Sequence, residues 1–471
     1  MKRIVIPEFG RIYRKGRSLN PETHENRIYL NAQLYKKLQQ TDRYFSRNGQ
    51  GIFTWYANHA QARQWVGVIQ LPGLLLEILP KIDAFTGTES PFYKKTKTNE
   101  ARKNLLYMLA IAGHVPVRSR DLAKLTNRKA PLSETLISIF ATRLLAEVLK
   151  GADRSYVYKE DNMRCFKGRL IVNRHLLKNT GHRERFYCLY DEFSDDTPLN
   201  QLFKSVCRTL LDVTKTPATQ DRLRNCLLIF DEVSDNPYPQ RTIDRVFLNR
   251  QNERFDDLYN FCRLVLSRHA PTVSAGWEKS FSLLFDMNKV FERFIAAFIK
   301  KQVLPDLPGY RLYPQARRNR RYLLQSPAGQ GVLRLEPDIL IQSPTGHFQV
   351  IDTKWKDLSS AARKTYSGAS RSDLYQLFAY SERYRCSKSI LLYPKVPGIS
   401  EFDLNILDDS GRASGSKIGV NFVNINRDLH LPIERQMLAA ELKQMVLEGF
   451  IGEFDVIDAE NYNNKEVGGS A

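Results

Sequence analysis

The chain has 471 residues, a length that one hydrophobic core rarely spans, so two or three domains are expected. Apolar residues make up 42% of the chain and aromatic residues 11%, which excludes a mostly disordered protein. The net charge of +20 favours a polyanionic partner, nucleic acid before an acidic membrane, and the alternative is a protein that is merely basic and soluble.

The sequence argues against a membrane protein and against secretion. The most apolar stretch, Leu71–Leu79, contains a proline and a glutamate and is far shorter than the ~20 residues of a membrane span. The N-terminus lacks the apolar run of a signal peptide. The six cysteines form no CxxC pair and no metal-binding spacing with the eight histidines. We therefore expect a cytoplasmic protein with reduced thiols and without a zinc site.

Residues 1–95 are expected to form a β-rich domain. Short apolar or alternating runs, separated by glycine, proline and asparagine, are typical of strands. These runs are Arg3–Ile6, Ile28–Leu30, Ile52–Tyr56, Trp65–Leu71 and Leu74–Ile78. The Pro72-Gly73 pair predicts a tight turn between the last two.

Residues 96–275 are expected to form a mainly helical domain. Apolar residues recur there at helical spacing, as in Leu105, Met108 and Leu109. A helix is predicted to begin at Thr197-Pro198, a capping residue followed by proline. An irregular basic stretch, Arg164–Arg185, interrupts the helical pattern.

Residues 276–455 change character again and predict a mixed sheet covered by helices. The predicted order is α-β-β-β-α-β, in an α+β multidomain protein. Its elements are a helix over about Trp277–Lys301, strands at Tyr310–Ala316, Val332–Gln342 and His347–Trp355, a helix at Ser372–Tyr384 and a strand at Ser389–Tyr393. Residues 456–471 are polar and predict a flexible tail.

The predicted second and third strands carry the residues that point to chemistry. Asp338 follows Pro337 on one strand, and Asp352 and Lys354 share a face at the end of the next. The short turn at 343–346 predicts a hairpin that brings Asp338 and Asp352 together. Two carboxylates at one point repel each other unless a cation lies between them, and oxygen ligands without cysteine or histidine select Mg²⁺, with Mn²⁺ as a substitute. A lysine beside them can hold a phosphate oxygen or assist an attacking water.

The acid-x-lysine triplet alone is a weak signal, because Glu441-Leu442-Lys443 matches it too. That second copy lies in an amphipathic pattern without an upstream Pro-Asp pair. Only Asp338, Asp352 and Lys354 combine an upstream Pro-Asp pair with an acid-x-lysine triplet on adjacent predicted strands. The competing interpretation is a hairpin with solvent-facing charges.

Further residues are candidates for the same site. Glu292, on the preceding helix, is a candidate third metal ligand, against the alternative of a surface charge. Gln376 and Tyr380 lie four residues apart on the following helix and can face the sheet edge, although an ordinary polar helix face is equally consistent. Four arginines between the first two strands predict a DNA-backbone contact, with solvated side chains as the alternative. These are Arg317, Arg318, Arg320 and Arg321.

The α-β-β-β-α-β order with these residues resembles the PD-(D/E)xK nuclease superfamily. Several stretches more narrowly resemble the McrC family, the nuclease subunits of McrBC modification-dependent restriction systems. They are GVIQLPGLLLEILPKID (67–83), FKGRLIVNRHLL (166–177), YDEFSDDTPLNQLFKS (190–205), NKVFERFIAAFI (288–299) and VIDTKWK (350–356).

The resemblance implies a Mg²⁺-dependent endonuclease that cuts double-stranded DNA only with an AAA+ GTPase ring, McrB, which recognises methylated cytosine. It also implies that the N-terminal part docks onto that ring and stimulates GTP hydrolysis. The chain itself has no GxxxxGK[ST] motif, since 411–417 (GRASGSK) has serine where the second glycine belongs, so the nucleotide would be bound by the partner. Two alternatives are a repair nuclease that works without a ring and a DNA-binding assembly subunit without catalysis.

Overall fold

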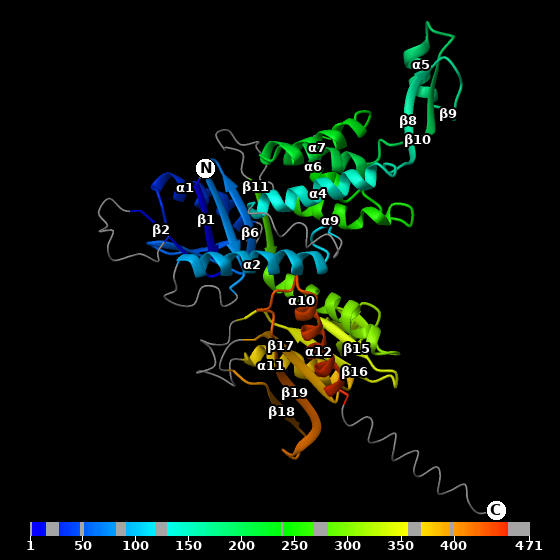
Figure 1. The fold of residues 1–471 in the computed structure, drawn as a ribbon. Coiled ribbons are helices and arrows are strands. Elements are labelled where there is room, and N and C mark those ends of the chain that lie inside the picture. The colour runs from blue at the N-terminus through cyan, green and yellow to red at the C-terminus, as the bar shows by residue number, and fades with distance from the viewer. Residues whose placement is uncertain are drawn as a thin grey trace, which may run out of the picture.

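The computed structural model shows a mixed α/β protein in which the N-terminal and helical parts lie side by side and the C-terminal part lies below both (Figure 1). The described residues are 2–15, 28–47, 51–81, 91–117, 130–236, 239–267, 281–356, 369–395 and 399–450. The predicted tail, 456–471, lies outside them. Within the described residues, no helix combines the length and apolar character that a membrane crossing requires.

The N-terminal part contains two four-stranded sheets that share a buried apolar core. The first has the order β1-β7-β6-β11, with β1 (Lys2–Pro7), β6 (Trp65–Leu71), β7 (Leu74–Leu79) and β11 (Phe281–Asp286). The second has the order β3-β2-β5-β4, with β2 (Arg11–Arg14), β3 (Ile28–Leu30), β4 (Phe53–Trp55) and β5 (His59–Ala62). The predicted strands are confirmed, whereas helix α1 (Ala32–Arg47) was not predicted.

Strand β11 corrects the sequence prediction, which placed residues 281–286 inside a helix from about Trp277. These residues pair antiparallel with β6, and the helix begins only at Met287. Gly67 permits this pairing, because a Cβ at that position would lie 2.0 Å from the carbonyl oxygen of Leu283. A short apolar run fits a strand as well as a buried helical turn, and the partner strand, more than 200 residues away, decides between them.

The helical part is built around one large apolar core. Its helices are α2 (Pro91–Ile111), α4 (Leu132–Val148), α6 (Pro198–Val213), α7 (Pro217–Ile229), α8 (Pro239–Ile243), the short η2 (Glu253–Phe255) and α9 (Asp256–Ser267). The hydroxyl of Thr197 accepts a hydrogen bond from the amide of Asn200, which confirms the predicted start of α6. The side chain of Asn104, on α2, donates to the carbonyl of Arg427 and so joins this part to the C-terminal part.

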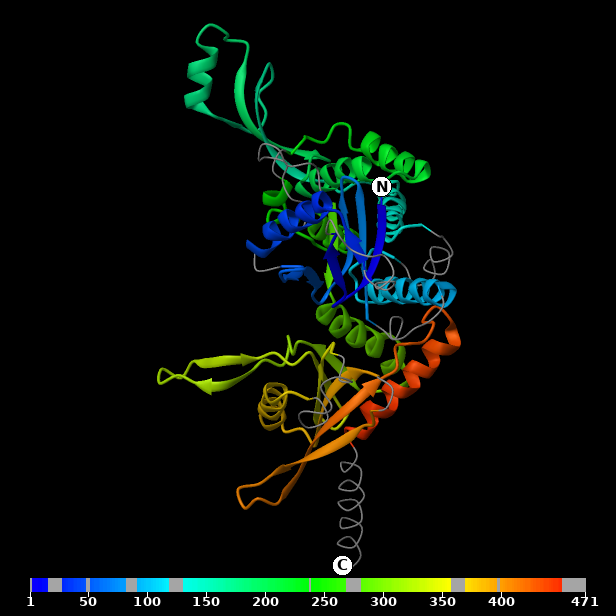
Figure 2. The same ribbon diagram turned by 90° about the vertical axis from the view of Figure 1, so that its left-hand side faces the viewer.

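The stretch predicted to be irregular and basic belongs to a projecting arm instead. A three-stranded sheet of order β8-β10-β9 and one helix form this arm, which extends away from the helices in both views (Figures 1 and 2). Its elements are β8 (Ser155–Met163), β9 (Arg169–Leu170), α5 (Val172–Asn179) and β10 (Phe186–Ser194). Strand β8 is mainly exposed and lacks the apolar alternation by which strands are recognised, so the sequence pattern concealed it.

The C-terminal part is a six-stranded mixed sheet of order β12-β15-β16-β17-β19-β18. Its strands are β12 (Arg311–Pro314), β15 (Ile339–Gln342), β16 (Phe348–Thr353), β17 (Lys388–Pro394), β18 (Phe402–Leu407) and β19 (Ala413–Val423). The helical elements are α10 (Met287–Phe298), the π-helical turn η3 (Ile299–Val303), the short η4 (Leu304–Asp306), α11 (Arg371–Tyr384) and α12 (Pro432–Glu448).

The predicted strand Val332–Gln342 is in fact two strands, separated at Glu336–Asp338. Residues before the break form β14 (Gly331–Leu335), which pairs with β13 (Arg321–Gln325) in a hairpin that projects from the sheet (Figure 2). Residues after the break form β15, which pairs antiparallel with β16 as predicted. Asp338 therefore lies immediately before β15 and not within a strand.

Candidate active site

Asp338 and Asp352 meet at the end of the β15–β16 hairpin. The register pairs Ile339 with Ile351, so that Asp338 and Asp352 are opposite each other one position further along. One carboxylate oxygen of Asp338, Oδ2, accepts hydrogen bonds from the amide and the hydroxyl of Thr353, both at 2.8 Å. Asp352 is almost fully buried, with 2% of its surface exposed. The hairpin predicted from the sequence thus brings the two carboxylates together.

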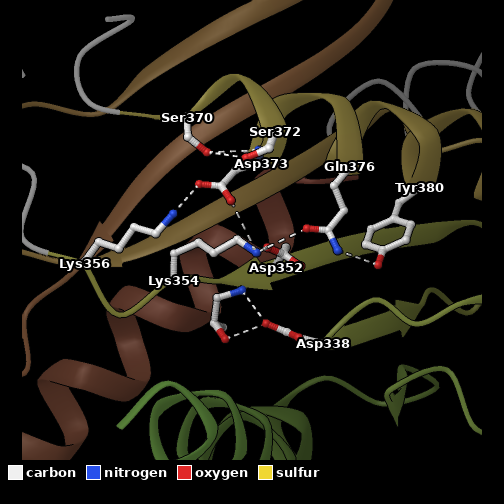
Figure 3. Close-up of polar contacts among 10 residues, drawn as sticks. Asp338, Asp352, Lys354, Lys356, Ser370, Ser372, Asp373, Gln376 and Tyr380 are labelled. Atoms are coloured by element: carbon white, nitrogen blue, oxygen red, sulfur yellow. Dashed lines mark hydrogen bonds and ion pairs between the residues drawn. The ribbon is translucent and has the colours of Figure 1, made fainter. Parts of the chain in front are cut away.

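Lys354 follows directly on β16 and reaches back over the same point (Figure 3). Its Nζ lies 2.6 Å from Oδ2 of Asp352 and donates a hydrogen bond of 3.3 Å to Oε1 of Gln376. Its backbone amide donates to the carbonyl of Leu392 on β17 at 2.9 Å, which fixes the chain after the strand has ended. The ammonium group is thus held beside the carboxylates by both main-chain and side-chain contacts.

The ionised forms of Asp338 and Asp352 are electrostatically unfavourable at these positions. Burial, followed by the negative charge of Glu292, raises the pKa of Asp338 to about 6. Burial, followed by the charge of Asp338, raises the pKa of Asp352 to about 6. Burial, the largest influence on Lys354, would lower its pKa, but the charge and hydrogen bond of Asp352, together with the charges of Asp373 and Asp338, outweigh burial and raise the pKa. A divalent cation would favour the ionised form of both carboxyl groups.

Helix α11 supplies a second row of polar groups. The side chain of Gln376 donates from Nε2 to the hydroxyl of Tyr380 at 3.0 Å, so both predicted residues face the sheet edge (Figure 3). Asp373 was not predicted. Its Oδ1 lies 3.7 Å from Nζ of Lys354, and its Oδ2 accepts from Lys356 at 2.8 Å. Burial opposes ionisation of Asp373, but its hydrogen bonds to Lys356 and Ser370 hold its pKa below the usual range.

A signal for Asp373 was present in the sequence. Ser370 caps α11 by accepting from the amide of Asp373 at 3.2 Å, and a serine followed three residues later by an acid is typical of a helix start. Asp373 lies three residues, about one turn, before Gln376 on the same helix.

Glu292 lies on α10 within electrostatic reach of the two aspartates. Burial raises its pKa, and the charge of Asp352 contributes. Its Oε1 accepts a hydrogen bond of 3.0 Å from Nε2 of Gln315, a residue that the sequence did not single out. Within the described part of the chain, no three histidine, cysteine, aspartate or glutamate side chains are gathered as a ready metal site. Glu292 is thus near the carboxylate pair without completing a closed ligand set.

The four predicted arginines divide into two groups. Arg317, Arg318 and Arg320 are exposed in the turn that follows β12, and Arg317 donates to Oε1 of Gln315 at 3.2 Å. Arg321 is half-buried instead, with its guanidinium 5.4 Å from the ring centre of Phe348 and 4.8 Å from that of Tyr384. Arg321 therefore anchors the base of the β13–β14 hairpin, and the other three present their charges to solvent.

The second acid-x-lysine triplet has an ordinary structural role. Glu441, on α12, accepts from the amide of Asn424 at 2.9 Å and forms an ion pair of 2.5 Å with Arg427. Lys443 lies 3.5 Å from Asp306 at the surface. The structure places this triplet in helix α12, as the amphipathic pattern predicted, and shows that Glu441 and Lys443 have partners of their own.

Comparison with known proteins places the chain in a family. The family model of the McrBC 5-methylcytosine restriction system component matches residues 60–394, which is more than half of the chain. A search of curated proteins finds no match.

One solved structure shares the fold of this chain over most of its length. A half-complex from the tetradecameric assembly of Thermococcus gammatolerans McrB AAA+ hexamers with bound McrC is similar with a TM-score of 0.61 and 21% identity. That match covers 94% of this chain and 100% of the other. A cryo-EM structure of the Thermococcus gammatolerans McrBC complex matches with a TM-score of 0.45 and 25% identity, over 64% of this chain and 90% of the other. The resemblance found in the sequence is confirmed by the family model, and the chain belongs to the family of McrBC 5-methylcytosine restriction system components.

Proposed function

We propose that this chain is the DNA-cleaving subunit of a methylation-dependent restriction system, hydrolysing phosphodiester bonds with Mg²⁺ together with an AAA+ GTPase ring. One observation carries the proposal. Two buried carboxyl groups with raised pKa values, Asp338 and Asp352, share the end of a hairpin with the ammonium group of Lys354. Such perturbed groups cluster at catalytic sites more often than at structural ones.

The arrangement of the C-terminal sheet supports a nuclease core of the PD-(D/E)xK type. Helix α10 precedes the paired strands β12, β15 and β16, and α11 leads to β17, which lies parallel to β16. The β13–β14 hairpin is inserted between the first two strands of this core. The strands β18 and β19 extend the sheet beyond β17.

The residues have separate roles in the proposed reaction. Asp338 and Asp352, with Glu292 nearby, carry the oxygen donors that hold a hard divalent cation. When bound there, Mg²⁺ would polarise the phosphate and lower the pKa of water, with Mn²⁺ as a substitute. Lys354 is placed to bind a phosphate oxygen or to orient the attacking water. Gln376 accepts a hydrogen bond from Nζ of Lys354 and so limits its rotation.

Double-stranded DNA is the proposed substrate. The exposed Arg317, Arg318 and Arg320 lie on the segment that joins β12 to the projecting hairpin, and Arg317 is linked through Gln315 to Glu292. Their exposure and the link to Glu292 support the proposal that they contact backbone phosphates. The net charge of +20 adds sequence-independent attraction to DNA.

The proposed partner is a McrB-like GTPase ring, docked through residues 1–275. The arm projects away from the rest of that region and exposes the large apolar residues Leu176 and Leu177 on α5. Large exposed apolar side chains on one element are typical of an interaction surface. Recognition of methylcytosine would then belong to the ring.

A second candidate is a DNA-binding assembly subunit without catalysis. It is favoured by the Lys354–Asp352 ion pair of 2.6 Å, in which the ammonium already neutralises one carboxylate. The deciding experiment measures cleavage of methylated plasmid by the chain with its ring and GTP, in Mg²⁺ and in excess EDTA. Mg²⁺-dependent cleavage supports the nuclease, no cleavage supports the assembly subunit, and cleavage without the ring indicates a stand-alone repair nuclease.

A further inference from the structure

Trp355 connects the proposed catalytic lysine to the sheet of order β1-β7-β6-β11, called the N-terminal sheet below. It is the residue after Lys354, only 6% of its surface is exposed, and its indole Nε1 donates a hydrogen bond of 2.6 Å to Oε1 of Glu8. Glu8 lies directly after β1, and its backbone amide donates to the carbonyl of Leu79 at the end of β7. A contact between residues 347 positions apart thus joins the first strand of the chain to the end of β16.

Burial of the Glu8 carboxyl group at this position is energetically unfavourable. It is 2% exposed, Oε1 also accepts from the amide of Lys81 at 3.0 Å, and Oε2 has no hydrogen-bond partner among the described residues. Burial raises the pKa of Glu8 to about 7. An apolar pair would fill the same space without this cost. Unlike an apolar contact, a directional hydrogen bond fixes the orientation of the indole ring.

The position of Trp355 matters for Lys354 because the strand has already ended. Beyond Thr353, the hydrogen bond from the Lys354 amide to Leu392 holds one side of the backbone. One residue further on, the indole of Trp355 fixes the chain through its hydrogen bond to Glu8. Its ring also packs against Phe291, with ring centres 5.3 Å apart, and Phe291 precedes Glu292 on α10. The same side chain therefore contacts the N-terminal sheet and the helix that carries Glu292.

A second connection runs through the same region. Strand β11 belongs to the N-terminal sheet and continues without a loop into α10, and the amide of Met287 donates to the carbonyl of Gln64 at 3.0 Å. The N-terminal sheet is thereby tied to Glu292 through the chain and to Lys354 through Trp355. A displacement of that sheet would reach both sides of the proposed site.

We infer that the Glu8–Trp355 hydrogen bond positions Lys354 for cleavage, so that the placement of the N-terminal sheet sets the geometry of the catalytic lysine. Glu8 and Trp355 are positioning residues that act through Lys354. This inference rests on the proposed nuclease function. It assigns to the N-terminal part a direct influence on the nuclease site.

The test uses full-length variants assayed with the partner ring, GTP, Mg²⁺ and methylated DNA. Trp355→Phe keeps an aromatic ring against Phe291 and removes the N–H donor, whereas Glu8→Leu removes the acceptor. Glu8→Gln keeps an amide oxygen that can accept both hydrogen bonds. Trp55→Phe is the matched control, because Trp55 donates to a carboxylate oxygen of Asp42 at the same 2.6 Å within the N-terminal part.

We expect Trp355→Phe and Glu8→Leu each to lower kcat for cleavage about 10-fold, with KM for DNA and the stimulated GTPase rate unchanged. Glu8→Gln restores most of kcat, and the Trp55→Phe variant cleaves like wild type. The double variant Glu8→Leu/Trp355→Phe is no slower than either single variant, because both remove one hydrogen bond.

Wild-type kcat in both Trp355→Phe and Glu8→Leu would overturn the inference. So would an equal loss in the Trp55→Phe control, which would indicate general destabilisation. If Trp355→Phe does not fold, the comparison of Glu8→Leu with Glu8→Gln decides, since equal rates in those two variants contradict a role for the hydrogen bond. Lys354→Ala separates the two proposals: full activity there contradicts the nuclease site itself, whereas inactivity there with a normal Trp355→Phe contradicts only the positioning role.

Discussion

Lys354 is the residue whose removal tests the proposed chemistry most directly. Lys354→Ala is expected to lower the cleavage rate about 100- to 1,000-fold, because it removes the only ammonium group seen within 3 Å of Asp352 in the described structure. DNA affinity should stay within about three-fold, since phosphate contacts are distributed over many basic residues. Cleavage is measured on methylated plasmid and affinity by fluorescence anisotropy.

Lys443→Ala is the matched control, because Lys443 ends the second acid-x-lysine triplet and contacts only the surface residue Asp306 among the described contacts. Wild-type cleavage is expected for it. Equal rates in Lys354→Ala and wild type would contradict the assignment of the lysine.

The raised pKa of Asp338 leads to a prediction about how folding stability depends on pH, which can be tested without measuring cleavage. A carboxyl group whose pKa rises from 3.8 to about 6 on folding binds protons more tightly in the folded state. Stability therefore falls as pH rises between these values, and the full cost, about 3 kcal/mol at most, is present above pH 6. In EDTA, Asp338→Asn should raise the melting temperature at pH 8 and lose this advantage toward pH 4.

Mg²⁺ extends the same measurement to metal binding. At pH 8 it should raise the melting temperature of the wild type more than that of Asp338→Asn, because binding to the folded state stabilises it. Thermal unfolding followed by fluorescence checks both effects. A variant that is less stable than wild type at pH 8 in EDTA, or an equal response of both proteins to Mg²⁺, would contradict the carboxylate pair as a cation site.

At the scale of single elements, the projecting arm is the feature that the nuclease core does not require. Leu176 and Leu177 on α5 expose 63% and 83% of their surfaces, so their replacement by aspartate should cost little folding stability. If the arm docks onto the ring, the Leu176→Asp/Leu177→Asp variant should bind it about 10-fold more weakly or worse. Ring binding and GTP turnover are measured together.

Leu228 on α7 provides the control for the arm, since it is 72% exposed but lies on the body of the helical part. Leu228→Asp is expected to leave ring binding unchanged. Normal binding by the arm variant would place the docking surface elsewhere in residues 1–275.

At the scale of the whole molecule, the two proposed activities should be separable. A full-length Asp352→Ala chain is expected to stimulate GTP hydrolysis by the ring at the wild-type rate and to cut no DNA, because Asp352 lies in the C-terminal sheet. GTP turnover and plasmid cleavage are measured in one reaction. Loss of stimulation in this variant would show that the division of labour between the parts is wrong.

The structure also determines which fragment could test that division. A fragment of residues 1–275 would lack β11, the strand that covers the edge of β6 in the N-terminal sheet. The unpaired edge of a largely buried strand promotes aggregation, because its free backbone groups can pair with another chain. Such a fragment should extend at least to Asp286, and its failure at 275 would carry no information about docking.

The sequence by itself determined the hairpin that pairs Asp338 with Asp352 and the helix that carries Gln376 and Tyr380. Asp338 and Asp352 were predicted to meet because strand alternation and a short turn fix the register of a hairpin over about 15 residues. The helical spacing of Gln376 and Tyr380 was equally consistent with contact to the sheet edge and with an ordinary polar helix face, and the structure decided for the sheet edge. The family resemblance was carried by short stretches of contiguous residues, which a sequence presents directly.

Only the tertiary structure decided the pairings between distant parts of the chain. Three contacts depend on partners far away in sequence. Residues 281–286 pair within the N-terminal sheet, and Glu8 contacts Trp355. Arg321 is anchored between Phe348 and Tyr384. Periodicity reports which face of an element is apolar, but it does not report which other element covers that face. For this reason the sequence predicted the carboxylates and the lysine of the site, and the fold alone revealed what holds the lysine in position.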